Sequence, residues 1–414
     1  MIKFLRRYYF FSTFQKQIQR EILSKKTPYG NVTEKIISLA GQELHKKPNH
    51  PLGIMRYKLQ SFFEDKQIPK GLLQKNQHTN YLVGDSFSPL ISVQKNFEDL
   101  LIPKDHVSRK RSDTYYVSED LIMRPQATAN ERDMFEQKQN AFIIFTDCFR
   151  RDEIDATHYP VFHQMEAVRI FQEEDFSSNT PQDTKIQLVM QDLQQTYESL
   201  IKFIFGQDIQ CRWIPAYFPF TEPSMELEIF YNNQWMEMLG CGILRPQILQ
   251  NFGRKNSDIA WASGCGLERF AMLLFDIPDI RLFWSQDQRF LNQFQAGQIH
   301  KFIPFSKYPL CYKDVSFWVN KSQCFEENDL HEICRELGGD LIESVVCQDT
   351  FINKKINRTS KCYRVSYRSL ERTLTNQEVF FNIFIYLICF IFQIDSIQFQ
   401  IRDQIQSKLG FELR

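Results

Sequence analysis

The stretch FRRDEIDATHYPVFHQMEAVRIF, Phe149–Phe171, places charged and aromatic residues between two apolar runs. The runs at 142–152 and 160–172 are typical of strands, and the polar stretch between them is typical of a loop. The sequence therefore predicts a hairpin. Because side chains alternate between the two faces of a strand, Arg150 and Asp152 are expected to share one face of the first strand.

The second strand of this hairpin places an aromatic ring, an amide and a carboxylate in a row. Phe162, Gln164 and Glu166 fall on one face by the same alternation. The guanidinium of Arg150 can hold a phosphate or carboxylate with a planar fork of donors, and the loop adds His158. A carboxylate beside an amide suits an ammonium group. The combination favours a site for a nucleoside triphosphate beside an amino acid, with a solvated, ion-paired sheet face as the alternative.

Two further stretches support a binding site. SGCGLERF puts Gly264 and Gly266 before a predicted helix that carries Arg269, which can lie over an adenine ring or contact phosphate. WIPAYFPF carries Phe218 and Phe220 on a predicted strand, where two rings on one face can hold a flat substrate ring. Taken alone, the two phenylalanines also fit an ordinary core.

The composition indicates a globular chain of two or three domains. It has 414 residues with 50 basic and 50 acidic side chains, so nucleic-acid binding would depend on local basic patches. Ten cysteines without a C-x-x-C pair argue against a zinc site and favour a reducing compartment. Residues 1–30 are basic, with no acid before Glu21, and indicate a mitochondrial targeting segment; an ordinary basic helix is the alternative.

The remaining pattern predicts a mixture of helices and strands. The first part is expected to hold helices at 45–66, 183–206 and from Gly266 to before Pro278, and strands at 211–220, 225–231 and 235–244. Residues 291–308 have little pattern and indicate a linker. From residue 309 the order strand, helix, strand, strand, helix, strand predicts a ferredoxin-like domain over 309–414.

The quoted motifs together resemble those of the class II aminoacyl-tRNA synthetases. FRRDEIDATHYPVFHQMEAV is similar to motif 2 in its phenylalanine-specific form, and GCGLERFAMLLFDIPDIRLF is similar to motif 3. FPFTEPSMELEIF and WMEMLGCGILRP resemble the remaining catalytic strands. The C-terminal region resembles the anticodon-binding domain of single-chain mitochondrial phenylalanyl-tRNA synthetases. The resemblance implies an α+β chain with a class II antiparallel-sheet catalytic domain over 45–290, followed by a ferredoxin-like (βαββαβ) anticodon-binding domain.

The same resemblance implies that L-phenylalanine is attached to tRNA(Phe) through a phenylalanyl-adenylate, with ATP as a substrate. Arg150 would be the catalytic group that neutralises charge on the α-phosphate. The residues implied for ATP are Arg150, Asp152, His158, Phe162 and Arg269. The residues implied for phenylalanine are Gln126, Thr128, Gln164, Glu166, Phe218, Phe220 and Ala262. Catalysis would consist of positioning and electrostatics, without a protein nucleophile.

Magnesium, tRNA and cellular location follow from the resemblance as well. The Mg2+ ligands would be Glu226, Glu228 and Glu237. The implied tRNA contacts are basic residues of the C-terminal domain: Lys354, Lys355, Arg358, Lys361, Arg364, Arg368 and Arg372. A solvated basic edge is the alternative for that cluster. A monomer without an obligate protein partner, in the mitochondrial matrix, is the family expectation.

One segment departs from the family pattern. Where an HTSAHQ-like segment is expected after an arginine, Arg124 is followed by PQATANE. Gln126 stands in place of a histidine, Thr128 in place of a serine and Glu131 in place of a glutamine. Threonine keeps the hydroxyl, whereas glutamine keeps hydrogen bonding but lacks a titratable ring. An inactive protein would direct attention to this segment first.

A second departure is the apolar run FFNIFIYLICFIFQI, Phe380–Ile394, which is 15 residues long (394 − 380 + 1) and looks inserted into the last helix. A surface helix cannot hide a run that is apolar all round, and a membrane span needs about 20 residues. We hypothesise a retained intron. The alternative is a genuine insertion that binds a partner or lies against a membrane.

Two rival functions belong to other classes. One is a non-catalytic RNA-binding protein on a synthetase fold, against which Arg150, Glu166 and Arg269 argue because RNA binding alone does not need them. The other is an enzyme that activates a carboxylate with ATP for an acceptor other than tRNA. The C-terminal domain argues against this second rival.

Overall fold

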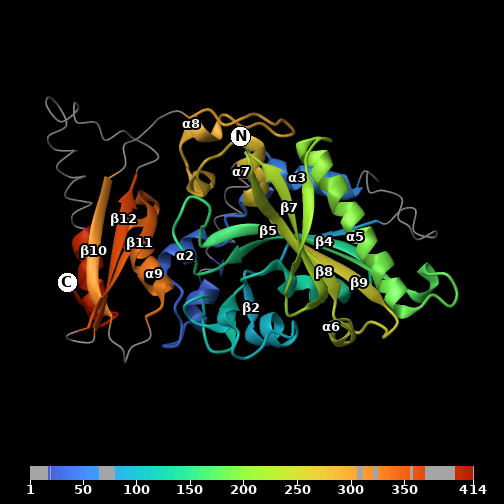
Figure 1. Ribbon diagram of the computed structural model, residues 1–414, viewed down its shortest axis with the longest axis horizontal. Helices are drawn as coiled ribbons and strands as arrows, with labels where there is room; N and C mark the ends of the chain where they lie inside the picture. The colour runs from blue at the N-terminus through green and yellow to red at the C-terminus, as the bar shows by residue number, and fades with distance from the viewer. Residues whose placement is uncertain are drawn as a thin grey trace. The chain divides into compact units, whose positions relative to one another are not determined.

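The computed structural model describes residues 17, 18, 20–64, 80–304, 311–319, 325–354, 358–368 and 397–413. The chain divides into two compact units, each of which is described by itself (Figure 1). The first unit comprises residues up to 149, 161–277 and 294–301, and the second comprises 150–160, 278–293 and the residues from 302 onward. The loop of the predicted hairpin thus belongs to the second unit.

The first unit is built on a seven-stranded sheet with the strand order β1-β4-β5-β9-β8-β7-β6. Its strands are β1 (Leu82–Gly84), β4 (Ala141–Phe149), β5 (Val161–Phe171), β6 (Cys211–Ala216), β7 (Thr221–Tyr231), β8 (Gln234–Leu244) and β9 (Ile259–Gly266). β1 runs parallel to β4, and the other neighbouring strands are antiparallel. The predicted antiparallel sheet is confirmed.

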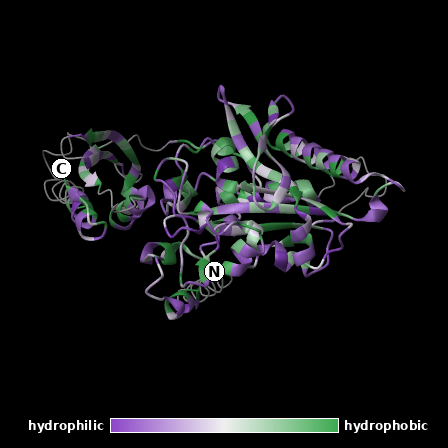
Figure 2. Ribbon diagram, turned by 60° about the horizontal axis from the view of Figure 1, so that its bottom comes forward, coloured by the Kyte–Doolittle hydropathy of each residue, from purple (hydrophilic) through white to green (hydrophobic). Residues whose placement is uncertain are grey.

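Three helices pack over one face of this sheet (Figure 1): α3 (Pro51–Glu64), α5 (Gln182–Phe205) and α7 (Leu267–Phe275). α5 lies against β8 and β9, where Tyr197 meets Trp261 edge-on with ring centroids 6.1 Å apart. Figure 2 shows hydrophobic and hydrophilic residues alternating along α5. The buried residues recur at helical spacing, which explains why the prediction of this helix is confirmed.

The opposite face of the sheet packs against the segment between β1 and β4. This segment contains β2 (Leu90–Ser92), β3 (Leu121–Met123), the short 3-10 helix η4 (Ala127–Asn130) and α4 (Glu131–Phe135). Phe97 and Phe135 from this segment share a core with Phe142, Val168 and Ala262 of the sheet. The remaining short elements of the first unit are α2 (Glu34–Leu39), η1 (Leu44–Lys46), η2 (Gln94–Glu98), η3 (Val107–Arg109), η5 (Glu173–Asp175) and α6 (Pro246–Asn251).

The second unit contains a four-stranded antiparallel sheet with the order β11-β12-β10-β13. Its elements are η6 (Ile280–Trp284), α8 (Gln288–Leu291), β10 (Cys311–Val319), α9 (Glu327–Gly338), η7 (Gly339–Leu341), β11 (Ile342–Asn353), β12 (Arg358–Tyr367) and β13 (Glu412–Leu413). Residues 397–407 are helical. Leu330 of α9 and Ile401 of the last helix share a core with Phe317 of β10. The predicted ferredoxin-like order is confirmed.

Two regions singled out in the sequence are outside this description. The apolar run at 380–394 and most of the basic segment at 1–30 lie among the residues that the structure does not describe. Within the described ranges, no helix combines the length and the apolar character that a membrane span requires.

Candidate active site

Two glycines, Gly240 and Gly264, leave the middle of one face of the seven-stranded sheet without side chains. In register, Glu166 on β5 pairs with Gly264 on β9, Gly264 pairs with Gly240 on β8, and Gly240 pairs with Glu226 on β7. Paired residues of antiparallel strands point to the same face of a sheet. Two carboxylates therefore flank two residues that have no side chain.

Only glycine fits at positions 240 and 264, because neighbouring side chains lie against the backbone there. A Cβ atom on Gly264 would lie 2.8 Å from Oε2 of Glu166, and a Cβ atom on Gly240 would lie 2.5 Å from Cζ of Phe218. The carboxylate and the aromatic ring thus approach the backbone more closely than any side chain would allow. The ring of Phe218 also stacks on Phe220, with centroids 5.9 Å apart and 11° between the planes.

Phe218 and Phe220 lie in the turn between β6 and β7. The prediction of a strand over 211–220 is wrong at its end, because β6 stops at Ala216. The backbone N–H of Thr221 donates to the carbonyl of Phe218 at 3.3 Å, which closes a turn around Pro219. The two rings therefore belong to this turn and not to the strand.

The sheet face beside the glycines is polar where η4 meets β5. The N–H of Ala127 donates to Oε1 of Gln164 at 2.9 Å, and the thiol of Cys148 donates to the same oxygen at 3.1 Å. The hydroxyl of Thr128 donates to Oε2 of Glu166 at 3.0 Å. Phe162 lies two residues before Gln164 on β5 and packs against the core of this face. The predicted alternation along β5 is confirmed.

A fully buried arginine positions the PQATANE segment. Arg124 donates to the backbone oxygen and to Oδ1 of Asp147 on β4, and to Oδ1 of Asn130 at 3.2 Å. These bonds tie the end of η4 to β4, and the bond from Ala127 to Gln164 ties its start to β5. Gln126 is half-buried at the residue before η4, and Thr128 is buried within it.

Burial controls the charge of the carboxyl groups near η4. It raises the pKa of Glu166 to about 7, against a lowering by the hydrogen bond from Thr128. Burial and then repulsion by Glu166 raise the pKa of Glu131 well above its usual value. Glu131 was not predicted as a site residue. Its only signal in the sequence is that it stands where the family pattern has a glutamine.

The three predicted magnesium ligands lie on β7 and β8. Glu228 pairs in register with Glu237, and Glu226 lies two residues before Glu228. Burial, followed by repulsion from Glu237 and Glu228, raises the pKa of Glu226, while Arg269 lowers it. Nη1 of Arg269 donates to the backbone oxygen of Glu237 at 2.8 Å. The structure thus brings Arg269 of α7 to this acidic group.

Ala262 lies two residues before Gly264 on β9 and is buried. By the alternation of the strand it shares the face of Gly264, and it pairs in register with Gly242 of β8. The structure therefore places a small side chain beside the glycines.

Arg150, Asp152 and His158 lie on the loop 150–160 of the second unit. The prediction that Arg150 and Asp152 share a strand face is wrong, because β4 ends at Phe149. The carboxylate of Asp155 accepts from the backbone N–H of Thr157 at 2.6 Å and of His158 at 2.8 Å. This side-chain turn bends the loop and competes with strand pairing.

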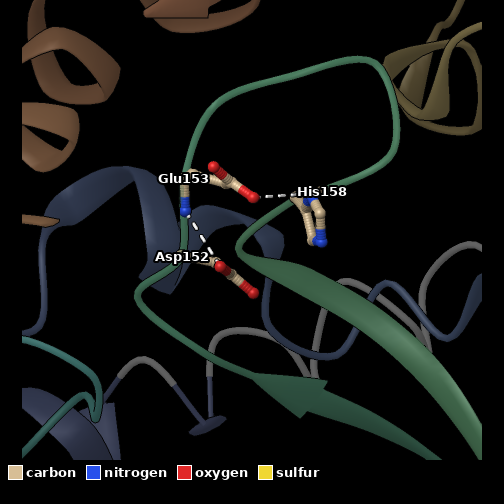
Figure 3. A group of neighbouring side chains, drawn as sticks. All are labelled: Asp152, Glu153 and His158. Carbon is tan, nitrogen blue, oxygen red and sulfur yellow. Dashed lines mark hydrogen bonds and ion pairs between the residues drawn. The ribbon is translucent and has the colours of Figure 1, made fainter. Parts of the chain in front are cut away.

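Asp152, Glu153 and His158 point toward one another on this loop (Figure 3). Their candidate ligand atoms lie within 4.8 Å of one another. Nδ1 of His158 lies 2.8 Å from Oδ2 of Asp155, and this hydrogen bond raises the pKa of His158. The ring therefore carries a positive charge to a higher pH than a free histidine does.

The second unit holds the loop at several points. The side chain of Ile154 is buried in the core of that unit, and its carbonyl accepts from the N–H of Val345 at 3.1 Å. Arg335 of α9 donates to the carbonyl of Asp152 at 2.6 Å, and the hydroxyl of Tyr159 donates to Asp340 at 2.9 Å. Side-chain and backbone contacts thus fix the loop conformation.

The predicted tRNA contacts are spread along the C-terminal sheet. Lys355 and Arg372 lie outside the described residues, and Lys354 is exposed at the residue after β11. Each of the other four forms an ion pair with an acidic side chain of this protein. The pairs are Arg358 with Glu412, Lys361 with Glu327, Arg364 with Asp314, and Arg368 with Glu343. Arg358 also lies over the ring of Trp318 and Arg364 over that of Tyr312.

Comparison with family models agrees with this architecture. The family described as "tRNA synthetases class II core domain (F)" matches residues 85–294, and the "Ferredoxin-fold anticodon binding domain" matches residues 306–383. Residues 85–294 therefore form a class II aminoacyl-tRNA synthetase core. The second match ends within the run at 380–394.

Curated relatives match nearly the whole chain. The mitochondrial phenylalanine--tRNA ligase of Dictyostelium discoideum is 42% identical, over 93% of this chain and 89% of that protein. The chloroplastic/mitochondrial phenylalanine--tRNA ligase of Arabidopsis thaliana is 41% identical, over 96% and 85%. The mitochondrial phenylalanine--tRNA ligase of Saccharomyces cerevisiae is 36% identical, over 84% and 87%. The chain belongs to the family of mitochondrial phenylalanine--tRNA ligases, and the resemblance found in its motifs is confirmed.

Proposed function

We propose that this chain attaches L-phenylalanine to tRNA(Phe) for mitochondrial protein synthesis, through a phenylalanyl-adenylate made from ATP. The row Glu166, Gly264, Gly240 and Glu226 carries this proposal. It has a buried carboxyl group for an ammonium at one end, the ring of Phe218 over its middle, and an acidic group with an arginine at the other end. The names of the relatives support the same reaction.

The phenylalanine substrate would bind between η4 and the glycines. Glu166, Gln164 and Thr128 form one hydrogen-bonded group that suits the α-ammonium, with Gln126 beside it. Phe218 and Phe220 would hold the ring edge-to-face or stacked, and the small Ala262 would leave room for its para position. Because these ring contacts are apolar, tyrosine would bring an unpaired hydroxyl.

The residues that the family resemblance implies for ATP would each have a separate role. Phe162 and Arg269 would hold the adenine ring between them. Arg150 would neutralise charge as an oxygen of the phenylalanine carboxylate attacks the α-phosphorus and pyrophosphate leaves. Asp152 would support the loop, and His158, whose pKa is raised, would attract the outer phosphates.

Magnesium would be held by Glu226, Glu228 and Glu237. Hard carboxylate oxygens are the ligands that Mg2+ prefers, and a cation would relieve the repulsion that raises the pKa of Glu226. When bound, Mg2+ would neutralise phosphate charge.

The ferredoxin-like domain would contact tRNA. Arg358 over Trp318 and Arg364 over Tyr312 combine a cation with an aromatic face, which suits phosphates and unstacked bases. Their present ion pairs would exchange for phosphate contacts, with Lys354, Lys355, Lys361, Arg368 and Arg372 adding charge. We further propose that the protein acts as a monomer in the mitochondrial matrix.

Two assays on the full chain test this function. ATP–pyrophosphate exchange should depend on phenylalanine and exceed exchange with tyrosine by at least about a hundredfold. In the second assay, the protein should charge mitochondrial tRNA(Phe) with phenylalanine. Exchange without charging would favour an enzyme with another acceptor, and neither activity would favour an RNA-binding protein. Arg364→Ala should raise KM for tRNA and leave pyrophosphate exchange unchanged.

A further inference from the structure

Two carboxyl groups are buried side by side at the polar end of the site. Glu131, the first residue of α4, has no exposed surface, and Glu166 is 3% exposed. Neither carboxyl oxygen of Glu131 has a hydrogen-bond partner in the part of the chain that the structure describes. An unpartnered buried carboxyl group is costly, and it is seldom found without a functional reason.

The backbone that precedes Glu131 is fixed against β5. The N–H of Ala127 and the hydroxyl of Thr128 bind Gln164 and Glu166, and Arg124 binds Asn130, the residue before Glu131. The placement of Glu131 beside Glu166 is therefore built into the segment. It does not depend on the rotamer of an exposed side chain.

Among the described residues, no basic side chain forms a hydrogen bond or an ion pair with Glu131 or Glu166. Arg124 binds Asp147, and Lys95 binds Asp133. On β9, burial and then the charge of Glu166 raise the pKa of Cys265 to about 12, so that its thiol stays neutral.

Bound protons, in place of a basic side chain, reduce the negative charge of Glu131 and Glu166. Burial raises the pKa of both carboxyl groups, and that of Glu166 reaches about 7. The only contribution that lowers it is the hydrogen bond from Thr128, and Glu131 is raised further by the charge of Glu166. Near neutral pH the pair therefore keeps at least one proton when no substrate is bound.

We propose that Glu131 is a second carboxyl group of the amino-acid site, and that the α-ammonium of the substrate displaces a proton from the Glu131–Glu166 pair as it binds. This inference rests on the proposed function. The proton leaves a carboxylic O–H for bulk water, and the resulting carboxylate faces the ammonium. No bond to the substrate forms or breaks in this step.

Calorimetry of L-phenylalanine binding to the full chain tests the inference. Binding is measured at about pH 8 in phosphate and in Tris, because the difference in buffer ionisation heat reports the protons released. Burial and the charge of Glu166 raise the pKa of Glu131 well above its usual value, so the proton that the ammonium displaces should depend on Glu131. The wild-type protein should release about one-half to one proton, and Glu131→Gln, which is isosteric, should release close to none. Glu136→Gln, an exposed neighbour 67% accessible, should behave as wild type.

Each outcome decides between the two proposals. Phenylalanine binding with equal proton release by wild type and Glu131→Gln overturns the inference and leaves the proposed function standing. Phenylalanine binding by the wild type without proton release also overturns the inference, whatever the variant does, and leaves the proposed function standing. A folded Glu131→Gln protein that no longer binds phenylalanine supports a place for Glu131 in the site. Absence of phenylalanine binding by the wild type overturns the proposed function itself.

Discussion

Glu166 lies over Gly264 so closely that a Cβ atom there would be 2.8 Å from Oε2 of its carboxylate. Gly264→Ala should displace this carboxylate, which Thr128 holds from the other side. Overpacking of this kind costs about 1–3 kcal/mol, so KM for phenylalanine in pyrophosphate exchange should rise about tenfold or more. Gly266→Ala on the same strand is the control, because nothing lies within 4 Å of its added Cβ. Equal effects of the two changes would contradict the role of Glu166.

Gly240 makes room for the ring of Phe218. Gly240→Ala would place a Cβ atom 2.5 Å from Cζ of that ring, and the ring would have to move away from the substrate. KM for phenylalanine should rise by about tenfold, while KM for ATP stays near its wild-type value. Gly242→Ala should have a different effect, because its Cβ would meet the backbone oxygen of Pro223, which cannot rotate away as a side chain can. That change should lower the melting temperature, whereas Gly240→Ala should not.

Arg269 connects α7 to the acidic group on β8. Arg269→Ala should raise KM for ATP by about five- to thirtyfold, because a cation over adenine contributes about 1–2 kcal/mol as it becomes desolvated. KM for phenylalanine should change little. Arg289→Ala is a matched control, since both side chains are half-exposed and bound to an acidic neighbour, Asp287 in the case of Arg289. A larger rise in KM for phenylalanine than for ATP would refute this assignment.

Stability should depend on pH through Glu166. Its pKa is raised from 4.5 to about 7 by burial, so the folded state keeps a proton that the unfolded state has lost between these two values. The unfolding free energy therefore falls as pH rises through this range, by about 3 kcal/mol from this group. Glu166→Gln should remove that part of the slope. Denaturant unfolding of both proteins from pH 4.5 to 7 measures it, and parallel curves would count against a raised pKa.

The run at 380–394 should be absent from the protein made in its native source. A tryptic digest should then contain the peptide TLTNQEVDSIQFQIR, which joins Val379 directly to Asp395. A peptide that contains FFNIFIYLICFIFQI would refute the intron hypothesis. Charging of tRNA by recombinant protein with and without Phe380–Ile394 shows whether the run is tolerated.

Local patterns predicted β5 and α5 well. A strand repeats every two residues and a helix about every 3.6, so the shared face of Phe162, Gln164 and Glu166 and the long helix at 183–206 follow from neighbours in the sequence. The ends of strands were harder to predict. β4 ends at Phe149, before a loop that the side chain of Asp155 bends, and β6 ends at Ala216, before the turn that holds Phe218 and Phe220.

The sequence by itself determined the order of the elements, the two-unit architecture that its motifs imply, and most of the polar and aromatic residues of the site. These depend on short-range periodicity and on motifs that are continuous in the chain. Only the tertiary structure decided that Glu166, Glu226, Gly240 and Gly264 form one row, because strand register joins residues far apart in sequence. It also decided that Glu131 is buried beside Glu166, since burial and missing partners depend on what the rest of the chain packs around a side chain.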